Sequence, residues 1–196
     1  MQPFLAAIRI LHRVNSFLLA IGRGIGVLAM AVMVLAILIQ VFFRYVLGNA
    51  LPWPDEAARF CMLWMTGLMA PTAFRTGGFV AIDTIEALLP GRAMQMLQIV
   101  LLSISLLVLL IAVQIGWSEV TGIGGRFATA SLYLPTSLSF DAWFRIPRSW
   151  MMMSLLVGIV LLILVNIELI LRSIAVVLRH EAGLPGITDL DIAGSE

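Results

Sequence analysis

Four long apolar stretches constrain this chain more than any other feature of its sequence. They occupy residues 25–43, 57–74, 94–113 and 149–171. Crossing the hydrocarbon core of a bilayer takes about 20 mainly apolar residues in a helix, and a helix satisfies its own backbone hydrogen bonds in lipid. The stretches therefore predict four transmembrane helices. The second is the least apolar, because it contains Arg59 and Pro71.

Composition agrees with a membrane protein and leaves no room for a separate soluble domain. Of 196 residues, 61% are hydrophobic and only 12% are charged, which no ordinary soluble domain matches. We expect an all-α integral membrane fold, with one four-helix transmembrane domain over residues 1–180. Residues 181–196 have too little to bury and are expected to form a mobile tail. The lipid bilayer is a partner, whereas nucleic acid is not, because no basic stripe is present.

Two further helices are expected at the membrane surface. Residues 1–24 place arginines among apolar residues at helical spacing, which predicts an amphipathic interfacial helix. Gly22 and Gly26 are expected to loosen the chain where it turns into the first span, and their spacing also fits close helix packing. A short interfacial helix is expected between the second and third spans, with Asp83 and Glu86 on adjacent rows.

The distribution of arginines indicates the orientation. If both termini are cytoplasmic, more arginines lie inside than outside, and Arg9, Arg13 and Arg23 all precede the first span. Positively charged residues favour the cytoplasmic side, and the first span often sets the orientation. We therefore expect both termini in the cytoplasm.

Charged and aromatic residues gather in the segment 44–64, at the boundary between the first two spans. We call the following residues the boundary cluster: Arg44, Trp53, Asp55, Glu56, Arg59 and Trp64. Charges where hydration is poor are costly, so such residues usually pair with each other or have a function. This cluster is therefore the first place to look for a functional surface.

The acids of the boundary cluster have two alternative interpretations. Asp55 and Glu56 follow a proline that suits the first position of a helix, and acids there complement the helix dipole. Either acid is spaced to pair with Arg59. Alternatively, Glu56 pairs with Arg44 across the first two helices and locks the hairpin that they form.

The aromatic residues also allow two interpretations. Trp53, Phe60, Trp64 and Gly67 follow a near-helical stripe in which Gly67 allows close approach of a neighbouring helix. The stripe is either part of an interfacial aromatic belt or a packing face for another membrane subunit.

Nothing in the sequence predicts catalysis, a cofactor or a metal site. Both histidines, His12 and His180, lie outside the spans, and no span has a metal-ligand cluster or a Ser/His/Asp arrangement. The single cysteine, Cys61, excludes a disulfide within the chain. Transporters with their own substrate path usually show broken helices or acids near the midplane, and this chain shows neither. We therefore expect an accessory subunit that is not an enzyme.

The motifs around the boundary cluster resemble those of a known family. Arg44-Tyr, Trp53, Glu56-Ala-Ala-Arg59, Trp64 and Gly67 are followed by Arg75-x-Gly-Gly and Asp83. This pattern resembles the small membrane (Q-type) subunit of tripartite ATP-independent periplasmic (TRAP) transporters, and the likeness covers all four spans. One departure is Phe79, where many family members have a histidine. The role of that histidine is not carried over to this chain.

The resemblance implies a three-part transporter in a bacterial inner membrane. A periplasmic binding protein captures an organic anion, commonly a carboxylate. A large membrane subunit moves it with sodium ions by an elevator-like motion, and the small subunit braces the scaffold of the large one. Sodium is therefore expected in the large subunit and no cofactor in this chain. The resemblance implies partner-interface or structural roles for Arg44, Trp53, Asp55, Glu56, Arg59, Trp64, Gly67, Arg75 and Asp83.

Two other classes of function remain open at this point. The chain could be a free-standing four-helix assembly or scaffold protein, which would purify as a homo-oligomer without a larger partner. The class that the sequence favours least is an intramembrane enzyme or cytochrome subunit, because the ligands and nucleophiles for it are missing.

Overall fold

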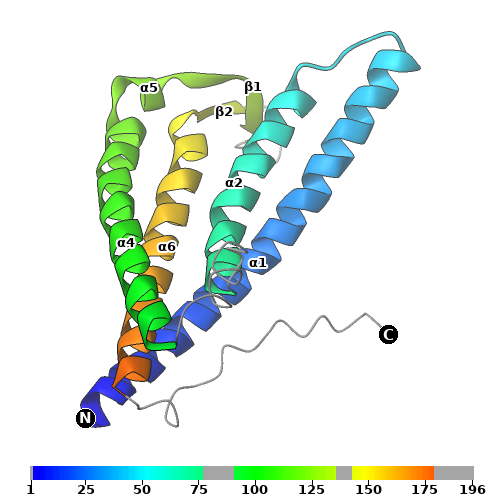
Figure 1. Ribbon diagram of the computed structural model, residues 1–196. Coiled ribbons are helices and arrows are strands. Elements are labelled where there is room, and N and C mark those ends of the chain that lie inside the picture. The colour runs from blue at the N-terminus through cyan, green and yellow to red at the C-terminus, as the bar shows by residue number, and fades with distance from the viewer. Residues whose placement is uncertain (1, 77–90, 136–142, 179–196) are drawn as a thin grey trace, which may run out of the picture.

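A computed structural model describes residues 2–76, 91–135 and 143–178 of the chain (Figure 1). Along the chain, its elements are α1 (Gln2–Tyr45), α2 (Trp53–Arg75), α4 (Gly91–Thr121), α5 (Ile123–Arg126), β1 (Ala128–Pro135), β2 (Trp143–Pro147) and α6 (Ser149–Val177). Three sequence expectations lie outside the described residues: the interfacial helix around Asp83, the position of Phe79, and the tail over 181–196.

The chain is mostly helical, and three of its described helices are long and apolar enough to cross a membrane. The candidate spans are Phe4–Tyr45, Met94–Thr121 and Ser149–Val177. They contain three of the four apolar stretches, so the helical membrane class is confirmed. With 23 residues, α2 is long enough to span. It is less apolar than the other three, and its crossing stays a prediction.

One continuous helix replaces the expected interfacial helix and first span. α1 runs without a break from Gln2 to Tyr45, so the expected turn at Gly22–Gly26 is wrong. These glycines face α2 instead. A Cβ atom on Gly22 would lie 3.2 Å from the Leu68 carbonyl oxygen, and one on Gly26 would lie 2.7 Å from Cγ of Met69. The missing side chains let the two helices approach, and this packing offsets the poor helix propensity of glycine.

α6 lies at the centre of the bundle and packs against α1, α2 and α4. α1 and α2 form an antiparallel pair, and the chain turns back between them at Gly48, whose φ of 66° favours glycine. α4 packs chiefly on α6, where Gly116 lies against Leu156. The start of α1, the end of α2, the start of α4 and the end of α6 lie at one end of the bundle (Figure 1).

A β-hairpin lies at the opposite end of the bundle, between α5 and α6 in the chain (Figure 1). β1 and β2 pair antiparallel, with Ala128 opposite Pro147 and Pro135 opposite Trp143. The buried hydroxyl of Thr129 donates a hydrogen bond of 2.7 Å to the carbonyl oxygen of Ile146. The hairpin crosses from the α4 side of the bundle towards α2 (Figure 1).

Candidate functional site

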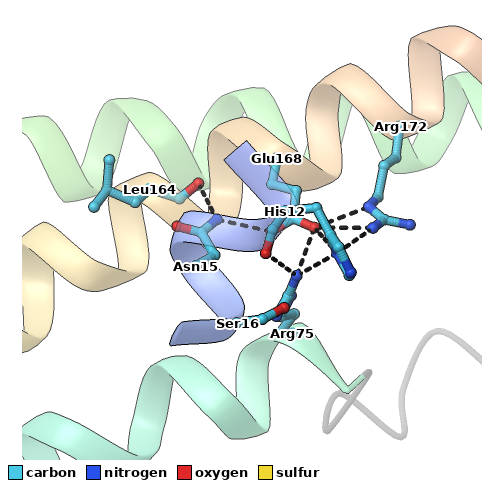
Figure 2. A network of polar contacts seen from close by, with 7 residues as sticks. All are labelled: His12, Asn15, Ser16, Arg75, Leu164, Glu168 and Arg172. Atoms are coloured by element: carbon cyan, nitrogen blue, oxygen red, sulfur yellow. Dashed lines mark hydrogen bonds and ion pairs between the residues drawn. The ribbon is translucent and has the colours of Figure 1, made fainter. Parts of the chain in front are cut away.

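Polar side chains from three helices meet at the end of the bundle that holds the start of α1 (Figure 2). We call this group the junction network. Its members are His12, Asn15 and Ser16 of α1, Arg75 of α2, and Glu168 and Arg172 of α6. Asn15 and Glu168 are almost completely inaccessible, and Arg75 is also buried. A buried polar cluster that joins three helices is the strongest candidate site in the described part of the chain.

The carboxylate of Glu168 is the centre of the junction network. Its Oε1 accepts hydrogen bonds from Nη2 of Arg75 at 2.8 Å and from Nε of Arg172 at 3.0 Å. Its Oε2 accepts one from Nδ2 of Asn15 at 2.7 Å. A buried carboxylate is tolerated only when it is paired and hydrogen-bonded. One side chain of α6 thereby binds both α1 and α2.

His12 completes the network through its ring nitrogen Nδ1. Nη2 of Arg75 lies 2.6 Å from its Nδ1, and Nη2 of Arg172 lies 2.7 Å from the same atom. Guanidinium groups only donate, and two of them converge on this nitrogen. Nδ1 also lies 3.0 Å from Oε1 of Glu168, so this one ring nitrogen contacts all three charged side chains of the network.

Local sequence explains why these groups point to one place. His12, Asn15 and Ser16 are three and four positions apart and therefore share one face of α1. Arg75 ends α2, where a cation complements the negative end of the helix dipole, and its Nη1 donates to Oγ of Ser16 at 2.9 Å. No local sequence pattern marks this site, because its members come from three separate helices. One feature of the sequence could have predicted it. Because consecutive spans alternate in direction, the start of α1, the end of α2 and the end of α6 lie on the same side of the membrane.

A second polar contact joins α2 to the hairpin at the other end of the bundle. We call it the hairpin contact. The carboxylate of Glu56 accepts hydrogen bonds from the backbone nitrogen of Ala130 at 2.9 Å and from that of Ser131 at 2.5 Å. The Ser131 hydroxyl lies 2.6 Å from Glu56 and 2.9 Å from the carbonyl oxygen of Pro52. Glu56 therefore ties β1 to the first turn of α2.

The hairpin contact also changes the acidity of Glu56, which precedes the apolar part of α2. Partial burial alone would raise the pKa of this carboxyl. The hydrogen bonds from Ser131 and Ala130 outweigh that effect, and with the guanidinium of Arg145 they lower the pKa below its ordinary value. The ionised form is thus the one that holds the hairpin.

We expect Glu56→Gln to loosen the hairpin, because the charged acceptor is lost. Hydrogen bonds to charged groups contribute about 1.5–3 kcal/mol, so amide hydrogen exchange in residues 128–135 should become roughly tenfold to a hundredfold faster. The wild-type contact should be complete above the ordinary carboxyl pKa of about 4.3 and lost as the pH falls through the lowered pKa. Asp55→Asn is the control, and equal exchange in both variants would contradict the assignment.

The structure does not contain the ion pairs expected in the boundary cluster. Glu56 contacts the hairpin instead of Arg44 or Arg59. Asp55 accepts a hydrogen bond of 3.4 Å from Nε2 of Gln40. Among the described residues, neither Arg44 nor Arg59 has an ion-pair partner, and the Arg44 guanidinium lies 5.8 Å from the centre of the Tyr45 ring. Two backbone amides of β1 point at the carboxylate of Glu56, so they take the place of an arginine as its hydrogen-bond donors.

The aromatic residues and Gly67 of the expected stripe lie in different surroundings. Trp53 is exposed at the start of α2. The ring of Trp64 lies 6.3 Å from that of Phe60, and its buried Nε1 has no hydrogen-bond partner in the described part of the chain. Gly67 packs directly on the backbone of α6 at Ser154 and Gly158. The glycine thus serves a contact within this chain.

The polar side chains of the two contacts stabilise the fold. No group of three or more His, Cys, Asp or Glu side chains among them could hold a metal ion. The carboxylate of Glu168 is enclosed by donors from its own chain, and the carboxylate of Glu56 binds the hairpin. What this arrangement does is hold three helices and a hairpin in one fixed geometry.

Comparison with known proteins identifies a family. The model of one protein family, described as "Tripartite ATP-independent periplasmic transporters, DctQ component", matches residues 33–176. The matched region covers well over half of the chain, from the last third of α1 to the last turn of α6. None of the curated proteins and none of the solved structures compared matches the chain.

Proposed function

The chain belongs to the DctQ component family of tripartite ATP-independent periplasmic transporters, and we propose that it braces the scaffold of the large membrane subunit. In this proposal, a periplasmic binding protein delivers an organic anion, most simply a carboxylate. The large subunit then moves the anion inward with sodium ions. The observation that carries the proposal is the family match over residues 33–176.

The internal contacts of the bundle support a bracing role. A scaffold must keep its shape while a neighbouring domain moves, and discrete packed contacts resist deformation. In this chain the junction network fixes one end of α1, α2 and α6, and the hairpin contact fixes the other end of α2. The buried charge of Glu168 is used for these contacts, which leaves it unsuited to binding a transported ion.

The proposed topology has four spans with both termini in the cytoplasm. In this topology α2 crosses the membrane together with α1, α4 and α6. The junction network then lies towards the cytoplasmic side, and the hairpin lies towards the periplasm. Arg9 and Arg13, which are exposed on α1, would follow the preference of arginine for the cytoplasmic side. The membrane would be the bacterial inner membrane, as a periplasmic partner requires.

Purification from the native membrane in mild detergent tests the proposal. We expect the chain to co-purify in a fixed ratio with a polytopic protein of at least about twice its mass. Mass spectrometry would identify that protein, and the periplasmic binding protein should associate with the pair when its anion is present. If the chain purifies only as a homo-oligomer, the proposal is wrong and the free-standing scaffold becomes the better explanation.

A further inference from the structure

One face of α2 combines exposed charged and apolar residues. We call this face the outer stripe, and it consists of the exposed residues Asp55, Arg59, Met62, Leu63, Thr66 and Ala73. Their spacing of three, four and seven places them along one side of a helix. The buried residues of α2, which include Leu68, Pro71 and Arg75, lie on the opposite side.

The outer stripe is poorly suited to lipid. Asp55 and Arg59 carry charge, and Arg59 has no ion-pair partner in the described part of the chain. By contrast, the exposed residues in the middle of α4 are aliphatic, for example Ile104, Leu107 and Val108. An unpaired charge facing hydrocarbon is costly, whereas an aliphatic face matches lipid tails. The composition of α2 agrees with this contrast. α1, α4 and α6 are apolar enough to count as candidate membrane spans, whereas α2 is not.

We propose that the outer stripe is the surface on which the large membrane subunit packs, with a carboxylate of that subunit opposite Arg59. Apolar side chains of the partner lie against Met62 and Leu63, which are 50% and 40% exposed. This inference rests on the proposed function and adds the helix through which the partner binds. The aliphatic face of α4 is left for lipid.

Arg59 is the residue through which charge complementarity acts. Its position one turn into α2 places the guanidinium close to the membrane boundary, where pairing with a carboxylate replaces lost hydration. Thr66 lies two turns further along, and its hydroxyl already donates to the carbonyl oxygen of Met62 at 2.9 Å. The hydroxyl oxygen therefore offers the partner an acceptor and presents no unsatisfied donor.

Site-specific photo-crosslinking tests the surface in the assembled complex. A photoreactive phenylalanine analogue replaces Met62 on the outer stripe or Val108 on α4, two similarly exposed positions at 50% and 57%. We expect an adduct with the large subunit from position 62 and none from position 108. An adduct from 108 alone, an adduct between two copies of this chain at 62, or only lipid adducts at 62 would each overturn the inference.

Charge reversal gives an independent measurement. Arg59→Glu should lower the amount of large subunit recovered with the chain by roughly tenfold or more, as expected when one member of a buried charge pair is removed. Arg59→Lys should retain most of it. Arg126→Glu, an exposed charge reversal on α5, is the matched control. Unchanged recovery with Arg59→Glu would contradict the role of this residue.

The failure of this inference differs from the failure of the proposed function. If the wild-type chain recovers no large subunit, the proposed function itself is wrong. If the wild-type complex forms but position 62 gives no adduct with the large subunit, the chain is still a transporter subunit and only the choice of helix is wrong.

Discussion

Replacing Glu168 with alanine is expected to destabilise the bundle by roughly 3–5 kcal/mol, because it leaves buried cationic groups without their carboxylate. Arg75 is 8% exposed, and its Nη2 lies 2.8 Å from the carboxylate. Arg172 lies on the next turn of the same helix as Glu168. The measurement is thermal unfolding of the purified chain in detergent or in lipid nanodiscs, where the midpoint should fall by several degrees.

Two further variants distinguish loss of the ion pairs from general damage. Glu119→Ala removes an exposed carboxylate near the end of α4 and should leave the midpoint nearly unchanged. A double-mutant cycle of Glu168→Ala with Arg75→Ala should give a coupling energy well above zero, since each variant removes the partner of the other. Additive effects would mean that the two side chains do not interact, and the junction network would then lose its central contact.

Replacing Gly158 with leucine is expected to separate α2 from α6. A Cβ atom on Gly158 would lie 2.6 Å from the carbonyl oxygen of Gly67 and 2.9 Å from its Cα. These are backbone atoms, so the clash is relieved only if the helices move apart. Overpacking of this kind costs about 1–3 kcal/mol, and loss of the close contact adds to it. The expected result is a lower unfolding midpoint and weaker recovery of the large subunit.

The matched control for Gly158 is Gly24 in α1. No atom lies within 4 Å of a Cβ atom built on Gly24, so Gly24→Ala should be neutral or slightly stabilising by helix propensity. Gly158→Ala should already be destabilising. If Gly158→Ala and Gly24→Ala had the same effect, the two helices would not cross as closely as described.

The membrane character of this chain could be predicted from its sequence because it depends on local composition. The apolar stretches 94–113 and 149–171 lie within α4 and α6, and the structure extends both helices towards their C-termini. Hydrophobic length alone determines such elements. The break at Gly22–Gly26 was a wrong prediction because glycine serves equally for loosening a helix and for close packing. The two roles can be told apart only when α2 is seen to pack against Gly22 and Gly26.

The polar contacts were harder to predict because their partners are distant in the sequence. The spacing of Glu168 and Arg172 indicates a pair within one helix, but nothing local shows that Arg75 and Asn15 reach the same carboxylate. For Glu56, the sequence indicated partners that the structure does not show. Two nearby arginines looked like its partners, whereas backbone amides of the hairpin bind it. The hairpin itself was missed because small residues such as Ala130 and Ser131 give β1 a weak strand pattern.

The most direct test of the account is uptake into proteoliposomes that contain purified components. With the periplasmic binding protein outside and an inward sodium gradient, the account predicts anion uptake only when the large subunit and this chain are both present. The Glu168→Ala chain should support much less uptake than the Glu119→Ala control. Full uptake by the large subunit without this chain, or uptake by this chain alone, would contradict the claim that it is a bracing subunit.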